Sequence, residues 1–246
     1  MGLNIADGWS RLSGLARRQT MAIAAALVAV TGLWAFVGIA EEVAEGETHA
    51  LDRALLLMLR MTDDPTRTVG PLWLRTALMD FTALGSVAVL ALVVILMATL
   101  FLSLKRWREA LVLVVASGGG VMISQGLKLV FGRARPDESL RLVEAVNASF
   151  PSGHAMLSAV VYLTLGALAA RFADLRRIKV FALSAGVMFA LLVGVSRVYL
   201  GVHWPSDVLA GWCVGAAWAM ICYLAVWALE RPWRLGQENP EVPHET

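Results

Sequence analysis

The feature that most constrains this fold is the length of its apolar runs, several of which match the thickness of a bilayer. An α-helix needs about 20 mainly apolar residues to cross the hydrocarbon core. Runs of that length lie at residues 19–40, 84–103, 108–130, 155–171, 179–196 and 207–229. The composition agrees, because 58% of the residues are hydrophobic and 16% are charged, outside the usual range of soluble proteins. The sequence therefore predicts an all-α, polytopic membrane protein, with residues 1–246 forming a single domain built as a bundle of six transmembrane helices.

The first run has an alternative interpretation, a cleaved signal peptide with Arg17 and Arg18 before it and small residues at Gly38 and Ala40. Its apolar stretch is longer than the hydrophobic region of a typical signal peptide. A membrane span is therefore the favoured interpretation, and the count of six includes it.

The basic residues predict how the bundle is oriented, since cytoplasmic loops of membrane proteins carry an excess of Lys and Arg. If the N-terminus lies inside, twelve of the 21 basic residues fall at cytoplasmic ends of the spans: Arg11, Arg17, Arg18, Lys105, Arg106, Arg108, Arg171, Arg176, Arg177, Lys179, Arg231 and Arg234. Residues 1–18 are then a cytoplasmic N-terminal segment, and residues 231–246 are a cytoplasmic tail. We expect a bacterial inner (cytoplasmic) membrane, with the links after the first, third and fifth spans facing the periplasm or exterior.

A long segment, residues 41–84, joins the first two predicted spans on the outer side. Leu51, Leu55 and Met58 recur in it at helical spacing, which predicts an amphipathic helix lying on the bilayer. A structural cap is the favoured role for this helix, and a lid that admits a lipid from the side is the alternative. Three polar residues near the start of the second span are expected to cap helices rather than to line a site: Asp80, Thr82 and Ser86.

Cations gather at the predicted outer ends of the spans, where Lys128, Arg135 and Arg197 lie. Basic residues near a membrane usually anchor its cytoplasmic side, so this outer position needs another explanation. A transferring phosphoryl group requires neutralisation of its equatorial oxygens, and guanidinium groups match those oxygens well. The three cations therefore predict a phosphate-binding site. Arg133, two residues before Arg135, is interpreted either as a contact to a second phosphate or as a solvent-facing side chain.

The tetrapeptide Pro151-Ser152-Gly153-His154 opens the fourth predicted span. Ser152 is expected at the N-cap position, and Gly153 leaves the backbone amides accessible. The free N–H groups and the dipole of a helix N-terminus bind anions. The tetrapeptide alone is equally compatible with an ordinary helix cap, and only its combination with the other motifs favours an anion site.

Two imidazoles lie at the same predicted face, His203 before the sixth span and His154 at the start of the fourth. Asp207, four residues after His203, can accept the Nδ1–H of that imidazole and leave its Nε2 free as a nucleophile. A single His–Asp pair is more often a structural hydrogen bond. Two outer-face imidazoles with different partners, however, are typical of a nucleophile and a general acid. The other histidines, His49 and His244, lie outside these motifs.

Taken together, the motifs resemble the three-part signature of the type 2 phosphatidic acid phosphatase superfamily, which includes bacterial acid phosphatases and vanadium haloperoxidases. Six residues separate Lys128 from Arg135-Pro136, and the Pro-Ser-Gly-His tetrapeptide follows. Five residues separate Ser196-Arg197 from His203, and three separate His203 from Asp207. Agreement of three motifs with these spacings is far more specific than any one motif. The resemblance covers residues 128–207, and the six-span layout resembles the integral-membrane branch of the family.

The resemblance implies a role for each matching residue. His203 attacks phosphorus and forms a phosphohistidine, and Asp207 holds its tautomer. His154 protonates the leaving lipid oxygen and then acts as base for the water that hydrolyses the intermediate. The residues that hold the phosphoryl oxygens are Lys128, Arg135, Arg197 and, through their backbone amides, Ser152 and Gly153. The family chemistry needs no metal and no other cofactor, so none is expected.

With this resemblance, the sequence predicts metal-independent hydrolysis of a lipid phosphate or diphosphate at the outer face, with the lipid chain entering between helices. Candidate substrates are undecaprenyl diphosphate, phosphatidylglycerophosphate, phosphatidate and lipid A phosphates, and family analogy favours the polyprenyl diphosphate. Expected partners are the substrate and membrane lipids, with no nucleic acid and no predicted oligomeric state. The alternatives are a lipid phosphotransferase, a vanadate-dependent peroxidase, which the spans disfavour, and a non-catalytic lipid-phosphate-binding protein, which the intact histidine pair disfavours.

Overall fold

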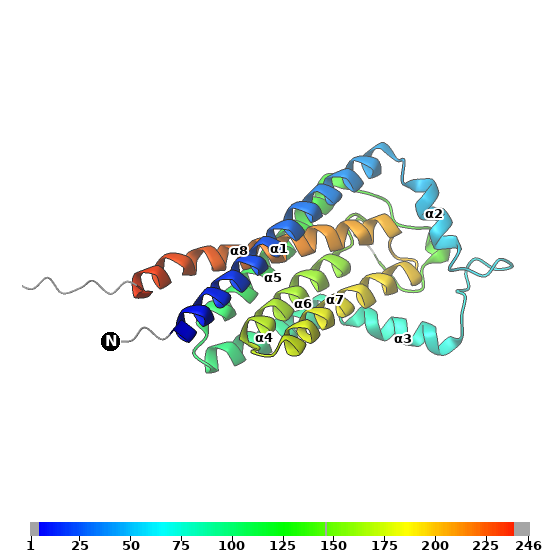
Figure 1. The fold of residues 1–246 in the computed structure, drawn as a ribbon. Helices are drawn as coiled ribbons and strands as arrows, with labels where there is room; N and C mark the ends of the chain where they lie inside the picture. The colour runs from blue at the N-terminus through cyan, green and yellow to red at the C-terminus, as the bar shows by residue number, and fades with distance from the viewer. Residues whose placement is uncertain (1–4, 146, 239–246) are drawn as a thin grey trace, which may run out of the picture.

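Long α-helices run side by side through most of the computed structural model (Figure 1). The structure describes residues 5–145 and 147–238, with side chains described for 19–145 and 147–229. In chain order the helices are α1 (Ile5–Glu45), α2 (His49–Leu57), α3 (Leu72–Ala83), α4 (Val87–Ser103), α5 (Trp107–Phe131), the 3₁₀ helix η1 (Glu138–Leu140), α6 (Gly153–Phe172), α7 (Arg176–Tyr199) and α8 (Pro205–Glu238). The described residues contain no β-strand beyond an isolated bridge, so the predicted all-α class is confirmed.

Five helices are long and apolar enough to cross a membrane: α1 over Gln19–Glu45, α5, α6, α7, and α8 over Pro205–Leu229. Helices α3 and α4 pass the same test together, although they are bent by 53° where they meet. Counting this bent pair as one span gives the six predicted crossings, and the polytopic membrane fold is confirmed. The run predicted at residues 84–103 is only the second half of its span, because the break falls at residues 84–86.

The break between α3 and α4 occurs at Gly85 and Ser86. A Cβ at Gly85 would collide with Val193 of α7 and would lie 3.3 Å from the carbonyl oxygen of His154, so glycine alone permits this close approach. Ser86 then starts α4 as its N-cap, and its hydroxyl accepts a hydrogen bond from the backbone N–H of Val89 at 3.3 Å. The capping role expected for Ser86 is therefore confirmed.

Helix α6 lies at the centre of the bundle, where α5, α7 and α8 pack against it. In the most apolar stretch of α6, 67% of the residues are buried inside the protein, whereas the corresponding share is 22% for α7 and 17% for α1. Glycines permit these contacts, since a Cβ at Gly186 would lie 2.5 Å from the carbonyl oxygen of Tyr162, and one at Gly215 would lie 2.6 Å from that of Met156. Small residues allow membrane helices to approach closely, so the core is built on backbone contact as well as side-chain packing.

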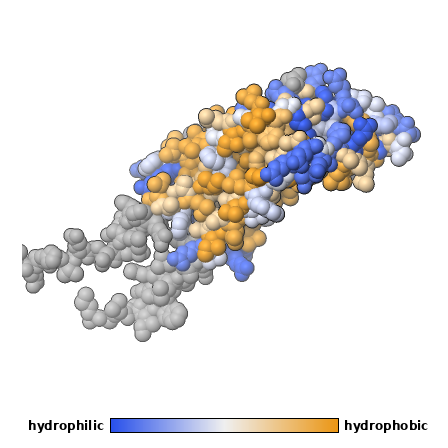
Figure 2. Space-filling model, turned by 90° about the horizontal axis from the view of Figure 1, so that it is seen from above, coloured by the Kyte–Doolittle hydropathy of each residue, from blue (hydrophilic) through white to orange (hydrophobic). Residues whose placement is uncertain are grey.

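The flank of the bundle is largely apolar, while most hydrophilic surface in this view lies at one end (Figure 2). Large apolar side chains are exposed on several helices, among them Leu27, Leu92, Ile95, Leu111, Val187 and Leu191. A contiguous apolar surface of this extent is costly in water, but it is the surface expected to face lipid chains.

The two ends of the bundle carry very different amounts of chain (Figure 1). One end holds α2, the loop between α2 and α3, the segment 132–152 with η1, and the turn between α7 and α8. The opposite end has only the short links 104–106 and 173–175 between helices. All three sequence motifs meet at the first end, which we call the motif end.

Helix α2 lies within the segment 41–84, where an amphipathic helix is predicted, and it is nine residues long. Leu51 and Met58 are 65% and 72% exposed, whereas Asp52 and Leu56 are buried. Leu51 and Met58 therefore point away from the protein while Leu56 packs inside it, and contact of the exposed side with the bilayer stays a prediction. The segment also contains α3, which packs against α7 and which the sequence analysis did not separate from the loop.

Candidate functional site

The segment after α5 crosses the motif end and is tied to its neighbours by backbone hydrogen bonds. Gly132 ends α5 in the left-handed conformation, with φ of +54°, and donates its N–H to the carbonyl oxygen of Lys128 at 3.1 Å. The N–H of Ser149 bonds to the carbonyl oxygen of Arg133 at 2.8 Å, and that of Ser152 bonds to the carbonyl oxygen of Asp207 at 2.9 Å. The first and second motifs are thereby fixed against the start of α8.

A tight turn between α7 and α8 carries the third motif. Arg197 lies in the last turn of α7, and Gly201 follows with φ of +71°, a conformation that favours glycine. A Cβ at Gly201 would also collide with the carbonyl oxygen of Leu140 in η1, so only glycine fits here. The turn places His203 just before α8 and Asp207 in the first turn of α8.

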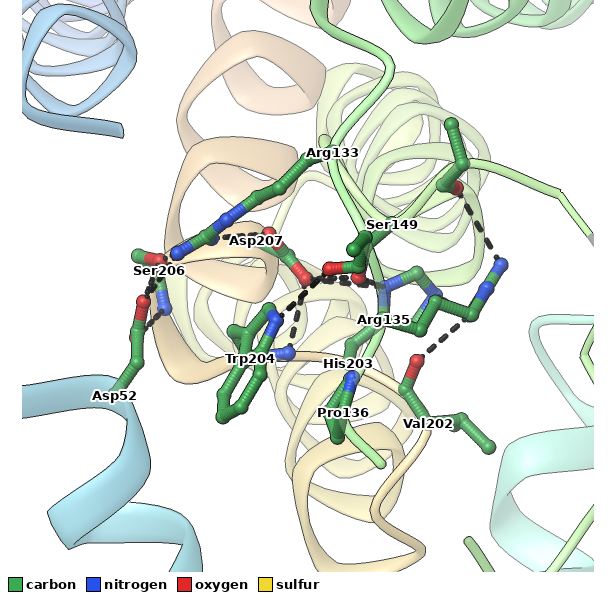
Figure 3. A network of polar contacts seen from close by, with 12 residues as sticks. Asp52, Arg133, Arg135, Pro136, Ser149, Val202, His203, Trp204, Ser206 and Asp207 are labelled. Atoms are coloured by element: carbon green, nitrogen blue, oxygen red, sulfur yellow. Dashed lines mark hydrogen bonds and ion pairs between the residues drawn. The ribbon is translucent and has the colours of Figure 1, made fainter. Parts of the chain in front are cut away.

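His203 and Asp207 form a buried pair (Figure 3). The Nδ1 of His203 lies 3.5 Å from Oδ2 of Asp207, and the same oxygen accepts hydrogen bonds from the Ser149 hydroxyl at 2.5 Å and the Trp204 N–H at 2.9 Å. On the other side of the ring, Nη1 of Arg135 lies 3.1 Å from Nε2. A guanidinium only donates hydrogen bonds, so Nε2 must carry the lone pair and Nδ1 the proton. A nucleophilic Nε2 requires this tautomer.

Burial keeps the His203 imidazole neutral. The residue is 1% exposed, and the loss of hydration lowers the pKa of His203 to about 3. Its hydrogen bond with Asp207 and the charge of that carboxylate oppose the shift, while the charges of Arg197 and Arg135 add to it. At neutral pH the lone pair on Nε2 is therefore available for attack.

Arg135 is clamped beside Nε2 by backbone carbonyl groups. Its Nε donates to the oxygen of Asn147 at 2.6 Å, and its Nη1 donates to the oxygen of Val202 at 2.7 Å. Burial lowers the pKa of Arg135, the charge of Asp207 raises it, and the charge of Arg141 lowers it. A guanidinium nevertheless stays protonated at physiological pH. Arg135 therefore presents a fixed positive charge where a phosphoryl group attacked by Nε2 would lie.

Two buried donors of the site have no partner within the described part of the chain. The hydroxyl of Ser152 is buried and unbonded, and so is Nε of Arg197, whose Nη1 donates to the Thr82 hydroxyl at 3.0 Å. Ser152 occupies the N-cap position of α6, as predicted, but its side chain makes no capping hydrogen bond. A Cβ at Gly153 would lie 3.6 Å from Nζ of Lys128, so the ammonium group approaches the start of α6. Such a group of open donors at a helix N-terminus suits an oxyanion.

His154 is the second residue of α6 and is half-buried. Its ring interacts electrostatically with Arg197, His203 and Lys128, and the described residues make no hydrogen bond to it. The second imidazole thus lies in the same cluster of charges as the first, with its nitrogens unengaged by the protein. The structure therefore brings together every residue that the sequence analysis assigned to the site.

Arg133 has neither of the two roles that the sequence analysis considered for it, a second-phosphate contact or a solvent-facing side chain. Its side chain is 13% exposed and bridges two carboxylates (Figure 3). Nη1 donates to Oδ1 of Asp207 at 2.6 Å and to the Ser206 hydroxyl at 2.8 Å. Nη2 donates to Oδ2 of Asp52 at 2.7 Å and to the Thr48 hydroxyl at 2.9 Å.

Other residues of the site also escaped sequence reasoning. Asp52 and Ser149 belong to no sequence motif, and nothing in the pattern of residues 41–84 singled out Asp52. Thr82 was assigned a capping role, which is wrong, because it lies inside α3 and its hydroxyl accepts from Arg197. Asp80 is exposed. A signal for Thr82 was present, since a hydroxyl in an apolar helix usually has a polar partner.

In residues 5–145 and 147–238, no three or more His, Cys, Asp or Glu side chains are grouped so as to hold a metal ion. Positive charge at the site comes instead from Lys128, Arg135 and Arg197. These side chains suit an anionic ligand, and the arrangement can position a phosphoryl group against Nε2 of His203.

The fold and the site are those of a membrane enzyme of phosphoryl transfer, and comparisons with known proteins identify its family. The family model of the PAP2 superfamily matches residues 88–231, more than half of the chain. Phosphatidylglycerophosphatase B of Bacillus subtilis is 37% identical over 146 residues, which cover 58% of this chain and 70% of that protein. The undecaprenyl-diphosphatase of Sulfolobus acidocaldarius is 33% identical over 48% of this chain and 55% of that protein.

Solved structures agree with the sequence comparisons. A transmembrane PAP2 type phosphatidylglycerolphosphate phosphatase from Bacillus subtilis superposes with a TM-score of 0.72 at 27% identity, over 82% of this chain and 98% of that one. LpxE of Aquifex aeolicus superposes with a TM-score of 0.51 at 26% identity, over 71% and 93% of the two chains. The chain belongs to the PAP2 superfamily and is an integral membrane phosphatase.

Proposed function

We propose that the protein hydrolyses a lipid phosphate or diphosphate through a phosphohistidine intermediate on His203. The observation that carries this proposal is the state of the His203 imidazole. It is buried and neutral, its Nδ1 is turned toward Asp207, and its Nε2 points at a guanidinium beside open hydrogen-bond donors. A nucleophile prepared in this way next to an anion site suits attack on phosphorus.

In the first step, the phosphoryl oxygens take up the donors of Lys128, Arg135, Arg197 and the amides at the start of α6. The Nη1 of Arg135 exchanges its bond to Nε2 of His203 for a phosphoryl oxygen, which frees the lone pair. Nε2 attacks phosphorus as the bond from phosphorus to the lipid oxygen breaks. His154 gives its proton to that oxygen, because the negative charge of the bound substrate favours a protonated imidazole there.

In the second step, the same residues act on water. His154, now neutral, removes a proton from a water molecule whose oxygen attacks the phosphohistidine. The bond between phosphorus and Nε2 breaks, and the electron pair returns to His203. Asp207 stabilises the positive charge that the imidazole carries while it is phosphorylated. Inorganic phosphate is released, and the cations that neutralise it make a metal ion unnecessary in this scheme.

Lipid phosphates are the proposed substrates because the relatives carry such names. Phosphatidylglycerophosphate is the first lipid to test, since a relative that shares 58% of this chain and a solved structure that covers 82% of it are named for it. Undecaprenyl diphosphate, favoured by analogy in the sequence analysis, is the second, and lipid A phosphates and phosphatidate complete the panel. Membrane lipids are the expected surroundings of the chain.

We also propose that the motif end faces the periplasm or exterior of a bacterial inner membrane, with residues 1–18 and 231–246 in the cytoplasm. Basic residues gathered at the opposite end support this orientation, among them Lys105, Arg106, Arg108, Arg176, Arg177 and Lys179. Labelling whole cells with a membrane-impermeant maleimide tests it. A cysteine replacing the exposed Thr66 is expected to react, one replacing Lys105 is not, and the reverse result would invert the topology.

The activity is tested by phosphate release from the lipid panel in detergent, with excess EDTA, for the wild type and His203→Asn. We expect EDTA-resistant release that disappears in the variant, together with an acid-labile phosphohistidine in rapidly quenched wild type. Release that survives in the variant would refute the nucleophile. A lipid phosphotransferase would share the intermediate, and product that forms only with an added alcohol acceptor would favour that second function.

A further inference from the structure

The guanidinium of Arg133 is enclosed between two buried carboxylates that come from distant parts of the chain. Asp207, on α8, is 0% exposed as a side chain, and Asp52, on α2, is 3% exposed. Each carboxylate receives one short hydrogen bond from a different terminal nitrogen of Arg133, at 2.6 Å and 2.7 Å. The planar guanidinium therefore fixes the distance and direction between the two acidic groups.

Asp52 is itself held by the start of α8. Its Oδ1 accepts the backbone N–H of Ser206 at 2.9 Å, and its Oδ2 accepts the Ser206 hydroxyl at 2.6 Å as well as Nη2 of Arg133. An unpaired N–H in the first turn of a helix favours a carboxylate partner. Asp52 thus serves as an anion at the N-terminus of α8. The residue it binds there, Ser206, directly precedes Asp207, whose carboxylate faces His203.

The contacts form one chain from α2 to the proposed nucleophile. Asp52 orients Arg133, Arg133 holds Oδ1 of Asp207, and Oδ2 of Asp207 faces Nδ1 of His203. One guanidinium serves two carboxylates, so its loss would leave two buried negative charges with no cationic partner in the described part of the chain. Removal of one partner from a buried ionic group is far more disruptive than replacement of the whole group.

We propose that Arg133 and Asp52 are positioning residues of the phosphoryl-transfer reaction, and that α2 sets its rate through them. This inference rests on the proposed function of His203. Helix α2 lies outside residues 88–231, which the family model matches, so this support comes from an element beyond the matched range. Neither residue touches the phosphoryl group, so both act through Asp207.

The test compares kcat and KM for Arg133→Gln, Arg133→Lys and Asp52→Asn. A matched control is available, because Arg53 of α2 pairs with Asp137 of the segment 132–152 at 3.9 Å, with side chains 55% and 68% exposed. The Arg53→Gln variant thus breaks a contact between the same two parts of the chain, but at the surface, where ion pairs contribute little.

We expect Arg133→Gln to lower kcat on the order of 100-fold and Asp52→Asn about 10-fold, in the range seen for residues that orient reactive groups indirectly. KM is expected to stay within about twofold of the wild type, and Arg53→Gln to leave both constants unchanged. The double variant Asp52→Asn/Arg133→Gln is expected to be no slower than Arg133→Gln alone, since one chain of contacts is already broken.

Several results would overturn the inference. One is an unchanged kcat in folded Arg133→Gln, and another is a loss confined to KM, which would indicate direct contact with substrate. Independent, additive losses in the double variant would break the proposed chain. If Arg133→Gln does not fold, as judged by thermal melting and gel filtration, Arg133→Lys and Asp52→Asn decide the matter by the same criteria.

A spectroscopic readout separates this inference from the proposed function. The imidazole ¹⁵N resonances of His203, assigned by comparison with His203→Asn, report its tautomer without substrate. The wild type is expected to show the Nδ1–H form alone, and Arg133→Gln to show a second form. If the wild type releases no phosphate from any lipid, the proposed function fails while this spectrum still decides positioning, and identical spectra for the two proteins would refute it.

Discussion

Two parts of the site, the residues that hold His203 and the residues proposed to bind the phosphoryl group, differ in how completely the protein satisfies its own polar groups. On the Nδ1 side, Asp207 accepts hydrogen bonds from Arg133, Ser149 and Trp204, and Arg133 in turn has partners for both terminal nitrogens (Figure 3). Among the residues proposed to bind the phosphoryl group, which we call the open side, the hydroxyl of Ser152 and the Nε of Arg197 are buried without a partner in the described chain. The polar groups that hold His203 are fully hydrogen-bonded within the protein, whereas the open side keeps buried donors without acceptors.

This difference separates two requirements of catalysis. A nucleophile must be held in one orientation, which a fully bonded polar network achieves. An anion site must instead keep donors available, although a buried donor without a partner costs about 1–3 kcal/mol of stability. Binding of a phosphoryl group would supply the missing acceptors. The cost of the unsatisfied donors is then present only in the empty protein, and its relief on binding contributes to the affinity for the ligand.

The largest effect is expected for His203→Asn. The amide keeps a polar group of similar size but has no nucleophilic lone pair at Nε2, so phosphate release should fall on the order of 10⁴-fold. Steady-state release in detergent measures it, with thermal melting to verify folding. A residual rate near that of the wild type would show that His203 is not the nucleophile, and the contrast between its bonded surroundings and the open side would then have no catalytic meaning.

Arg197→Gln tests the open side next, and kcat/KM is expected to fall about 10²- to 10³-fold because a charged donor to the transferring group is lost. Arg197→Lys should recover part of this loss, since it restores the charge but not the planar fork. Inhibition by vanadate, which mimics the phosphoryl group in its transition state, should weaken in parallel. Unchanged vanadate inhibition in Arg197→Gln would show that this side does not bind the anion.

The sharpest comparison uses two serines that are both 0% exposed, Ser149 on the bonded side and Ser152 on the open side. Ser149→Ala removes a donor to Asp207 and should destabilise the protein by about 1 kcal/mol while lowering kcat. Ser152→Ala removes an unsatisfied hydroxyl, so the empty protein should be equally or more stable, and vanadate inhibition should weaken several-fold. Equal destabilisation by both substitutions, seen in melting temperatures without ligand, would contradict the comparison.

The last test concerns pH and does not involve the bound substrate. The pKa of His203 is about 3 in the folded protein, against about 6.5 in an unfolded chain. Between these values the unfolded chain binds a proton that the folded protein does not, so the contribution of His203 to stability is lost as pH falls from about 6.5 toward 3. The slope approaches about 1.4 kcal/mol per pH unit. Melting of the wild type and His203→Asn from pH 7 to pH 4 measures it, and equal slopes would refute a neutral His203.

Much of the fold followed from hydropathy, because each lipid-exposed helix needs a long apolar run whatever its neighbours are. Helix α3 was missed as the first half of the second span, since Arg75 and Asp80 interrupt its apolar residues and Gly85 breaks it from α4. The motif residues were found because their spacing within the chain is fixed. Successive spans run in opposite directions, so the end of α5, the start of α6, the end of α7 and the start of α8 all lie at the same end of the bundle, and the motif side chains meet there.

The supporting network could not be predicted in the same way. Arg133 and Asp52 are 81 residues apart, and no periodicity links the end of α5 with a nine-residue helix. The apolar pattern of α2 does not show which of its polar residues is buried, and only the structure places the Asp52 carboxylate inward. Burial of a carboxylate depends on a partner that only the tertiary fold supplies.

The confinement of all catalytic candidates to one end of α6 has a consequence for lipid traffic. Helix α6 has 20 residues and is therefore roughly 30 Å long, close to the thickness of the hydrocarbon core. A headgroup in the far leaflet lies a full membrane thickness away from Nε2 of His203. If the substrate is a membrane lipid, as proposed, the position of the site would select a leaflet before it selects a lipid, and a substrate made on the other side would first need a separate translocation step.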